Sequence, residues 1–284
     1  MSARLPAFTL VAASALLLAA AAAPATAPRG GLSSSPVAIR EWTVPWERTR
    51  PRDPFVDGKG RVWFVGQAGN YIAHLDPEKG TFRRFAIDSG THPHNLIVDR
   101  AGMVWYAGNR NAMIGKLDPA TGAITRYPMP AAVRDPHTLV FDAAGNIWFT
   151  AQQSGYVGRL DTKSGKVDAL AVATPDARPY GIVVAPDGRI WFNEFGVNKL
   201  ASIDPRTLAI TEYEQPEART RGRRLEATKD GAIWYVDYTR GMLGRFDPAS
   251  RTWAEWANPG GVNSMPYAMA QDAKGRIWFV ETGQ

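Results

Sequence analysis

The sequence predicts an all-β fold, a β-propeller built from four-stranded blades. A short strand that ends in an aromatic pair occurs six times, and its tryptophans are 42, 43, 43, 43 and 44 residues apart, which indicates a repeat architecture. These tryptophans are Trp63, Trp105, Trp148, Trp191, Trp234 and Trp278. Each follows a glycine-containing turn, and each turn follows an apolar run, which is the pattern of a tight β-hairpin. Two further strand-like runs complete most units, and four short strands per about 40–45 residues is the spacing of a propeller blade.

The N-terminal residues predict export. Arg4, an apolar run over residues 8–23 and the small residues Ala25-Thr26-Ala27 together indicate a secretory signal peptide over residues 1–27. The alternative is a membrane anchor, but an anchor needs about 20 apolar residues and this run is shorter. We expect a linker over residues 28–36, the propeller domain over residues 37–284, and no membrane association after cleavage. The expected compartment is the periplasm or the exterior of a bacterium.

Composition narrows the classes of partner. The chain has 284 residues, a formal charge of +6 and no cysteine, so its sheets alone must hold the fold together without disulfides. Lysine and arginine are mostly spread through turns and outer strands, whereas a nucleic-acid binder concentrates them on one face with interleaved aromatic residues. We therefore expect no nucleic-acid partner. The single repeat running through the chain favours one monomeric domain.

The blades follow one another from residue 37 onward. Residues 37–44 resemble the fourth strand of a blade, and we expect this strand to complete the last blade and close the ring. Five full units begin near Asp53, Pro93, Pro136, Pro179 and Arg223. A sixth unit begins at Pro266 and stops after its second strand, so we expect a truncated seven-bladed ring. A six-bladed ring and a short protein with an imperfect sixth blade remain the alternatives.

The first strands of a propeller surround its central channel, and three sets of residues are expected at the channel mouth. Eleven residues before each tryptophan stand Arg52, His94, His137, Tyr180, Arg223 and Tyr267. Three residues after each tryptophan stand Gly66, Gly108, Ala151, Glu194, Asp237 and Glu281. Thirteen residues before each tryptophan stand Arg50, His92, Asp135, Arg178, Arg221 and Met265. The polar character of these sets predicts a ligand pocket at the mouth.

His137 and Asp135 form the pair that is most suited to chemistry. Residues two apart on an extended segment share a face, so the carboxylate could orient the imidazole or share a metal with it. The acids at positions 194, 237 and 281 occupy one structural position in adjacent blades, which favours a cation site with oxygen ligands. The alternative is that Asp135 stabilises a turn, that His137 lines a water-filled channel, and that the acids pair with neighbouring arginines.

The blade motif resembles the virginiamycin B lyase (streptogramin lyase) family of seven-bladed propellers. The motif is clearest in Arg178-Pro179-Tyr180-Gly181-Ile182, in Ile190-Trp191-Phe192-Asn193-Glu194 and in Asn198-Lys199-Leu200. The resemblance implies a magnesium-dependent lyase that opens a cyclic depsipeptide at its ester by elimination, with a histidine as the base.

On this resemblance His137 is the base and Asp135 is a metal ligand, and the metal would take its second carboxylate from Glu194 of the next blade. His94 and Tyr180 contact the substrate, and we add Arg178, Arg223 and Tyr267 as further substrate-binding residues. One departure from the family pattern is Ala151, which stands where the family has a glutamate.

The sequence therefore predicts an exported streptogramin lyase-like propeller that acts on a cyclic peptide, lactone or similar metabolite. The alternative is a non-catalytic propeller that binds an anionic or sugar ligand, or a protein partner, through the arginines of the mouth. A sugar-lactone hydrolase like the gluconolactonase propellers is a third reading, although its ligand set is not evident at the matched positions.

Overall fold

The computed structural model describes residues 38–283. The chain divides into two compact units, Met1–Glu41 and Trp42–Gln284. The predicted signal peptide and linker lie outside the described residues. Within residues 38–283, no helix has the length and apolar character that a membrane span requires.

The unit that begins at Trp42 confirms the predicted propeller architecture: its described residues form 22 strands in antiparallel sheets. The first sheet contains β1 (Pro51–Val56), β2 (Val62–Gly66), β3 (Tyr71–Asp76) and β4 (Thr81–Ala86). The second contains β5 (Pro93–Val98), β6 (Val104–Gly108), β7 (Met113–Leu117) and β8 (Ile124–Pro128). The third contains β9 (Pro136–Phe141), β10 (Ile147–Ala151), β11 (Tyr156–Leu160) and β12 (Val167–Ala171).

The remaining sheets continue the same order. The fourth contains β13 (Pro179–Val184), β14 (Ile190–Glu194), β15 (Lys199–Ile203) and β16 (Ile210–Glu214). The fifth contains β17 (Gly222–Ala227), β18 (Ile233–Asp237), β19 (Met242–Asp247) and β20 (Thr252–Ala257). The sixth pairs β21 (Pro266–Gln271) with β22 (Ile277–Glu281).

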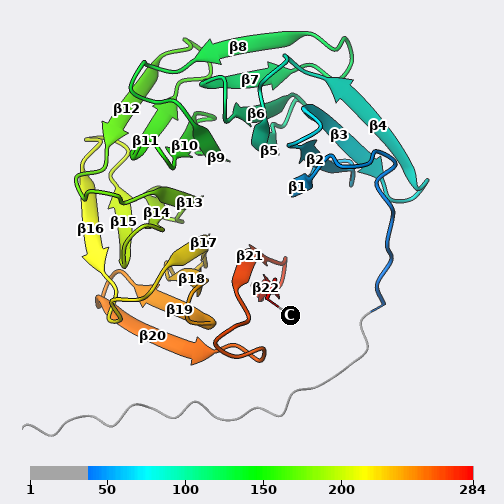
Figure 1. The fold of residues 1–284 in the computed structure, drawn as a ribbon. Helices are drawn as coiled ribbons and strands as arrows, with labels where there is room; N and C mark the ends of the chain where they lie inside the picture. The colour runs from blue at the N-terminus through cyan, green and yellow to red at the C-terminus, as the bar shows by residue number, and fades with distance from the viewer. Residues whose placement is uncertain (1–37, 284) are drawn as a thin grey trace, which may run out of the picture. The chain divides into compact units, whose positions relative to one another are not determined.

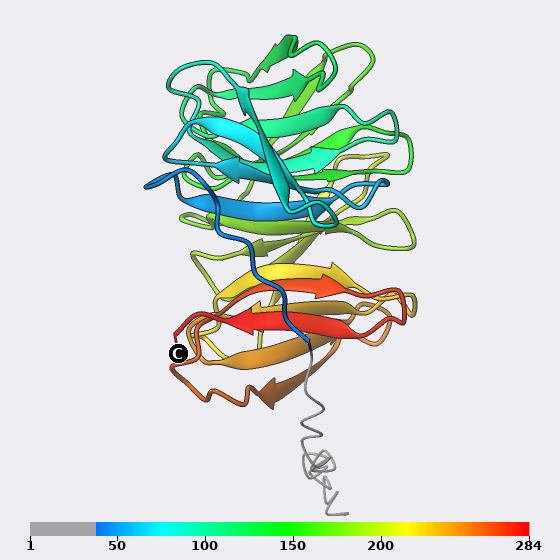
Figure 2. The same ribbon diagram turned by 90° about the vertical axis from the view of Figure 1, so that its right-hand side faces the viewer.

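Within this unit the first strand of each sheet lies innermost and the fourth lies outermost (Figure 1). Successive first strands contact one another, from β1 to β5 and on through β9, β13, β17 and β21. Seen from the side, the strands run across the view, so their connecting loops gather on two opposite faces (Figure 2). Apolar side chains fill the space between neighbouring sheets, where one cluster joins Trp105 of β6 to Phe149 of β10.

A carboxylate in the hairpin turn holds most of the repeated tryptophans. The indole Nε1 of Trp148 donates to Asp142 Oδ2 at 3.0 Å, and the same carboxyl group accepts the backbone amide of Asn146 at 2.9 Å. Equivalent bonds join Trp63 to Asp57, Trp105 to Asp99 and Trp278 to Asp272. The aspartate thus ties the hairpin turn to the indole, which is buried in the first three of these sheets.

The first strand of every sheet carries a shift in register. In the second sheet Pro93 pairs with Gly108, but Leu96 pairs with Tyr106, so His94 and Asn95 stand outside the ladder. The other five first strands show the same shift after their opening residues. A bulge of this kind bends a strand and redirects its side chains. In the second sheet it allows the successive residues His94 and Asn95 both to contact residues of neighbouring sheets near the centre.

The strand predicted over residues 37–44 is not formed in its described part, residues 38–44. A strand requires a hydrogen-bonded neighbour, and the described sixth sheet consists of β21 and β22 alone. Instead, Trp46 packs on the first sheet, with ring centroids 5.0 Å from Tyr71 and 6.1 Å from Phe82. The apolar residues of the predicted closing strand therefore do not complete a blade in this structure.

Candidate functional site

The residues that stand 11 positions before each tryptophan come together around the centre of the propeller unit. The imidazoles of His94 and His137 lie with their ring centroids 3.5 Å apart, and the ring of Tyr180 lies 4.4 Å from that of His137. The hydroxyl groups of Tyr180 and Tyr267 are 2.8 Å apart. Arg52 Nη2 donates to the Tyr267 hydroxyl at 2.7 Å. Five residues from five different sheets are thus joined by direct contacts.

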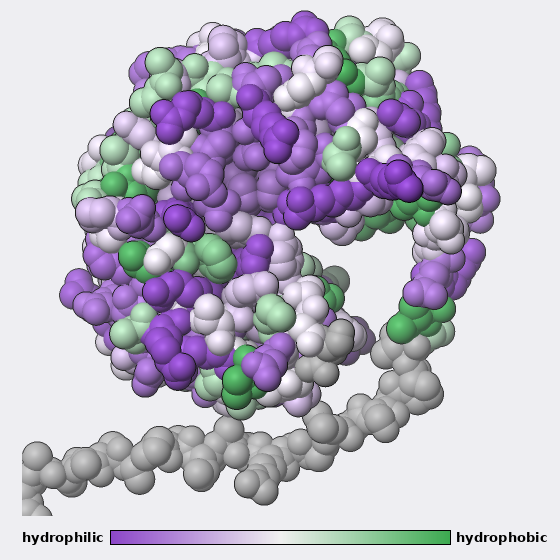
Figure 3. All heavy atoms as spheres, viewed as in Figure 1, coloured by the Kyte–Doolittle hydropathy of each residue, from purple (hydrophilic) through white to green (hydrophobic). Residues whose placement is uncertain are grey.

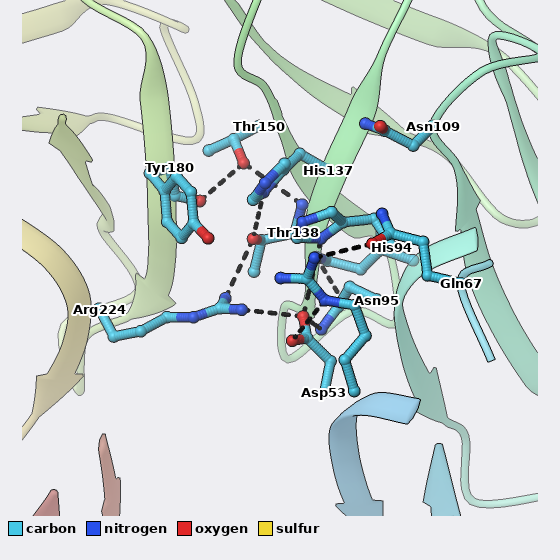
Figure 4. A network of polar contacts seen from close by, with 12 residues as sticks. Asp53, Gln67, His94, Asn95, Asn109, His137, Thr138, Thr150, Tyr180 and Arg224 are labelled. Carbon is cyan, nitrogen blue, oxygen red and sulfur yellow. Dashed lines mark hydrogen bonds and ion pairs between the residues drawn. The ribbon is translucent and has the colours of Figure 1, made fainter. Parts of the chain in front are cut away.

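A second set of central residues was missed by the sequence analysis. They are Asp53, Asn95, Thr138 and Arg224. Each immediately follows a residue of the first set, and the bulges turn them toward the centre as well. Arg224 Nη2 donates to Asp53 Oδ2 at 2.8 Å, and Arg224 Nη1 donates to Thr138 Oγ1 at 3.0 Å (Figure 4). Asn95 Nδ2 donates to the same Asp53 oxygen at 3.1 Å. The network links four sheets across the centre.

A glycine allows Arg224 to reach this network. A Cβ atom at Gly181 of β13 would stand 2.6 Å from the backbone oxygen of Arg223 and 3.0 Å from the Cα atom of Arg224. Such a contact is too short for any side chain, so the close approach of β13 and β17 requires glycine here.

The two central histidines are held neutral. Burial lowers the pKa of His137 well below 6.5, and the neighbouring His94 and Arg224 lower it further. Burial and the guanidinium groups of Arg52 and Arg224 likewise hold the pKa of His94 well below its usual value. His137 Nδ1 lies 2.9 Å from Thr138 Oγ1, in contact with the network around Asp53. A neutral imidazole has a lone pair available to accept a proton.

Asp53 is the carboxylate of this centre and it is ionised. Burial would raise the pKa of its carboxyl group, but Arg224 and Arg52 outweigh burial and lower the pKa below 3.8. Arg223 and Arg224 act on Tyr180 in the same way, because they lower the pKa of its phenol against the effect of burial. Arg52, Arg223 and Arg224 bring three positive charges to the centre, where Asp53 supplies one negative charge. The field therefore favours an anionic ligand or a reaction that develops negative charge.

Arg178 stands apart from the central network. It lies in the loop before β13 with an exposed side chain and a left-handed φ of 49°. Its carbonyl oxygen accepts the backbone amide of Phe195 at 3.2 Å, which joins the two loops of the fourth sheet. Arg178 thus belongs to the outer mouth, and its role in substrate binding stays a prediction.

Asp135 lies in the loop before β9, and its carboxylate is already engaged. Gln153 N donates to Oδ2 at 2.6 Å and Ser154 N donates to Oδ1 at 2.9 Å, with the Ser154 hydroxyl also bound to Oδ1. Asp135 therefore forms hydrogen bonds within a turn, which was the alternative interpretation of this residue. Within the described part of the chain its carboxylate forms no hydrogen bond with His137. Ala151 is fully buried and pairs with Pro136.

Glu194 is fully buried at the end of β14. Burial raises the pKa of its carboxyl group to about 7, and Glu212 adds to the shift, whereas Lys199 opposes it. Neither carboxyl oxygen has a hydrogen-bond partner among the described residues. Asp237 and Glu281, at the equivalent positions, accept backbone amides of their own loops.

The donor set does not fit a magnesium ion held by Asp135 and Glu194. Among residues 38–283 no group of three histidine, aspartate or glutamate side chains could hold a metal ion. Both oxygens of Asp135 are bound within its turn, and Glu194 tends toward its neutral form. Mg²⁺ requires ionised oxygen ligands in a near-octahedral arrangement. These two carboxylates are therefore not suited to hold the ion.

A cavity of about 740 Å³ opens beside the network. Its polar wall includes Arg52, Asp53, Asn95, Arg224 and Tyr267. Its apolar wall comes mainly from β21 and β22. The space-filling view shows hydrophilic residues gathered over the central part of one face (Figure 3). A small ligand therefore has both a polar and an apolar surface to contact beside the central residues.

Comparison with known proteins supports the same fold. The model of the virginiamycin B lyase family matches residues 100–284. A solved streptogramin B lyase structure is 28% identical, covers 86% of this chain and 80% of its own, and has a TM-score of 0.79. A catalytically inactive histidine-to-alanine variant of the Staphylococcus aureus virginiamycin B lyase, solved with quinupristin, is 24% identical, with coverages of 87% and 83% and a TM-score of 0.80.

More distant propellers share the fold alone. A gluconolactonase from Xanthomonas campestris is 16% identical, covers 81% of this chain and 82% of its own, and has a TM-score of 0.59. No curated protein sequence matches the chain.

Proposed function

Because this chain belongs to the virginiamycin B lyase family, we propose that its central site opens the ester of a cyclic depsipeptide or lactone-type metabolite by elimination. The observation that carries the proposal is the closely packed pair of neutral imidazoles, His94 and His137, at the centre of the propeller unit. A buried base without a charge, beside several guanidinium groups, suits the removal of a proton from a carbon acid.

His137 is the base in this proposal. In the tautomer with its proton on Nδ1, the ring donates to Thr138 Oγ1, which also accepts a bond from Arg224. Nε2 then takes the proton from the carbon next to the carbonyl group. The electron pair of that C–H bond forms the C=C bond, the C–O bond of the ester breaks, and its electron pair leaves on the carboxylate oxygen. The rings of His94 and Tyr180 both pack against the His137 ring and hold it in place.

The positive charge of the site stabilises the anion that forms. Proton removal develops negative charge on the carbonyl oxygen, and preorganised cations in a buried site stabilise such charge strongly. Arg52 and Arg224 are fixed by Asp53 and therefore need little rearrangement during the reaction. This assignment gives the arginines the electrostatic role that the family resemblance assigns to magnesium.

The proposal also places the mature protein outside the cytoplasm as a monomer, in the periplasm or the exterior. The motivation is the signal-peptide pattern over residues 1–27. Cell fractionation together with N-terminal sequencing tests it. Cleavage near residue 27 is expected, whereas an intact N-terminus in the cytoplasmic fraction would contradict export.

The test of the reaction is the loss of turnover in a His137→Ala variant, measured with a streptogramin B substrate by the appearance of the linear product. A His137→Asn variant keeps a polar side chain of intermediate volume and guards against a loss caused by misfolding. The control is His74→Ala, because His74 lies on β3 and packs against Trp63 with ring centroids 4.6 Å apart. Turnover by folded His137 variants at the parent rate would remove the mechanism.

The pH dependence adds a second check. The base must be unprotonated, and the pKa of His137 lies well below 6.5. The rate should therefore have reached its plateau at pH 6.5 and should fall only in more acidic solution. A rate that continues to rise above pH 6.5 would assign the base to another group.

A second candidate is a non-catalytic propeller that binds an anion. The observation that favours it is the excess of guanidinium groups over carboxylates at the centre. Binding of an anionic ligand by a protein that turns over no ester substrate would favour this candidate over the lyase.

A further inference from the structure

Arg223 lies in a cage of aromatic rings beside the central residues. Its Cζ atom is 4.1 Å from the ring centroid of Tyr267, 4.3 Å from that of Tyr238, 4.9 Å from that of Tyr180 and 5.0 Å from that of Phe195. Ring faces attract a guanidinium group through their quadrupoles and fix the orientation of its plane. The cage therefore holds one cation at a fixed place.

This cation has no anionic partner in the described part of the chain. Arg52 and Arg224 both contact Asp53, but no carboxylate lies within 4.0 Å of Arg223 in residues 38–283. Its buried Nε atom has no acceptor there, and its Nη2 atom makes a long bond of 3.3 Å to the Tyr180 hydroxyl. Arg223 is half-buried, so its guanidinium group has given up part of its water without gaining an anion, and a ligand that supplies the anion would be bound favourably.

The cage adjoins the proposed base. The ring of Tyr180 contacts both sides, with its centroid 4.4 Å from the ring of His137 and its hydroxyl bound by Arg223. Phe195 and Tyr238 directly follow β14 and β18, and backbone bonds from their amides to Arg178 and Arg221 hold both loops in place. When the reacting carbon of a substrate faces His137, another group of the same substrate would therefore lie within reach of Arg223.

We propose that Arg223 binds the carboxylate group that elimination releases, and that it stabilises this group as its charge develops. The proposal rests on the proposed function, since the carboxylate is formed when the C–O bond of the ester breaks. One guanidinium group balances one negative charge, and its planar N–H donors match a planar carboxylate. The expected ligand is thus a monoanionic carboxylate with an apolar body that can lie against the aromatic rings.

A binding measurement tests this assignment without any turnover. The probe is benzoate, with benzamide as its neutral isostere, and affinity is measured by isothermal titration calorimetry. Benzoate should bind the parent protein and the His137→Ala variant with similar affinity, and benzamide should bind at least about tenfold more weakly, as expected for the loss of a charge-assisted bond.

Variants at the cage give the comparison. Arg223→Gln should weaken benzoate binding by at least about tenfold, and Arg223→Lys should restore part of the loss because it keeps the charge but not the planar donors. The control is Arg83→Gln, because Arg83 also lies over an aromatic ring, 4.6 Å from the centroid of Phe85, but on the outer strand β4. Circular dichroism and the thermal midpoint establish that each variant is folded.

Several outcomes would overturn the assignment: no benzoate binding by the parent protein, equal binding of benzoate and benzamide, or folded Arg223→Gln that binds benzoate as the parent does. Displacement of benzoate by a lower concentration of inorganic phosphate would also overturn it, since the site would then prefer a different anion. A fall in the thermal midpoint of Arg223→Gln with unchanged affinity would give Arg223 a purely structural role.

A kinetic measurement connects the residue to the reaction. Arg223→Gln should lower kcat more than it raises KM, and inhibition by the linear product should weaken in parallel. If folded His137 variants keep the parent turnover, the proposed mechanism fails although the benzoate result stands. If benzoate binding is independent of Arg223 while His137 remains essential, only the present assignment fails.

Discussion

Removing Arg224 should destabilise the protein strongly, because it leaves a buried carboxylate with one partner fewer. Arg224 Nη2 lies 2.8 Å from Asp53 Oδ2, and their side chains are 14% and 7% exposed. Breaking a buried ion pair by truncating one partner costs about 3–5 kcal/mol. Because Arg52 still contacts Asp53 in the variant, we expect Arg224→Gln to cost about 3 kcal/mol, the lower end of that range.

The double variant separates the pair from its surroundings. Asp53→Asn alone removes the charge that Arg224 and Arg52 face, and it should also cost about 3 kcal/mol. Asp53→Asn combined with Arg224→Gln removes both charges, so its cost should fall at least about 1 kcal/mol short of the sum of the single variants. In the double variant neither Asp53 nor Arg224 leaves behind a buried charge that has lost its partner, and this is the reason for the coupling.

Equilibrium unfolding in urea at neutral pH measures these quantities by linear extrapolation. The control pair is Arg126 and Asp88, which also form a direct salt bridge, but their side chains are 54% and 31% exposed. Arg126→Gln should cost much less than Arg224→Gln, because water screens an exposed pair. Additive costs of Asp53→Asn and Arg224→Gln, or single costs as small as that of the control, would refute the reasoning from burial.

Two further predictions concern the repeated turn and the acidity of a buried glutamate. Asp142→Ala should lower the free energy of unfolding, measured in urea, by about 2–3 kcal/mol, since the indole N–H of the fully buried Trp148 loses its acceptor. The control Asp272→Ala should cost clearly less, because its partner Trp278 is 50% exposed and water can replace the lost acceptor. Burial raises the pKa of Glu226 to about 7 from 4.5, so it contributes stability that is complete below pH 4.5 and is lost as the pH rises through about 7. Thermal or urea unfolding of Glu226→Gln across this interval should show a smaller loss of stability with rising pH than the parent protein shows, and equal slopes would contradict the assignment.

The repeat period was sufficient to predict the sheets and where they begin. Strand starts at Pro93, Pro136, Pro179 and Pro266 agree with the predicted unit starts, and β17 begins one residue before the predicted Arg223. Periodic tryptophans succeed here because each indole occupies the same place in its hairpin, so a constant spacing reflects a constant structure. The family assignment follows from the same repeat.

The centre was predicted only in part. His94, His137, Tyr180 and Tyr267 come together as the spacing implies. Thr138 escaped prediction because regular alternation turns neighbouring residues to opposite faces, whereas the bulge cancels that alternation. The network that fixes His137 therefore depends on a local irregularity that the period alone does not reveal.

The pairing of Asp135 with His137 was inferred from alternation along a strand. β9 begins only at Pro136, so Asp135 lies in a loop, where alternation does not apply. There the backbone amides of Gln153 and Ser154 donate hydrogen bonds to its two carboxyl oxygens. The closing strand at residues 37–44 was a similar case, because strand-like composition does not supply a hydrogen-bonded neighbour.

The register shift at the start of each inner strand separates the central side chains from the backbone pairing of the sheet. The two side chains that it releases have left the regular pairing, while the remainder of each strand keeps its partners. Exchanging one of these dipeptides leaves the backbone hydrogen bonds of the rest of its strand in place, provided that the Asp53–Arg224 ion pair and a close backbone contact such as the one at Gly181 are kept. A directed library over these dipeptides would sample new specificities while leaving the architecture of the ring unchanged.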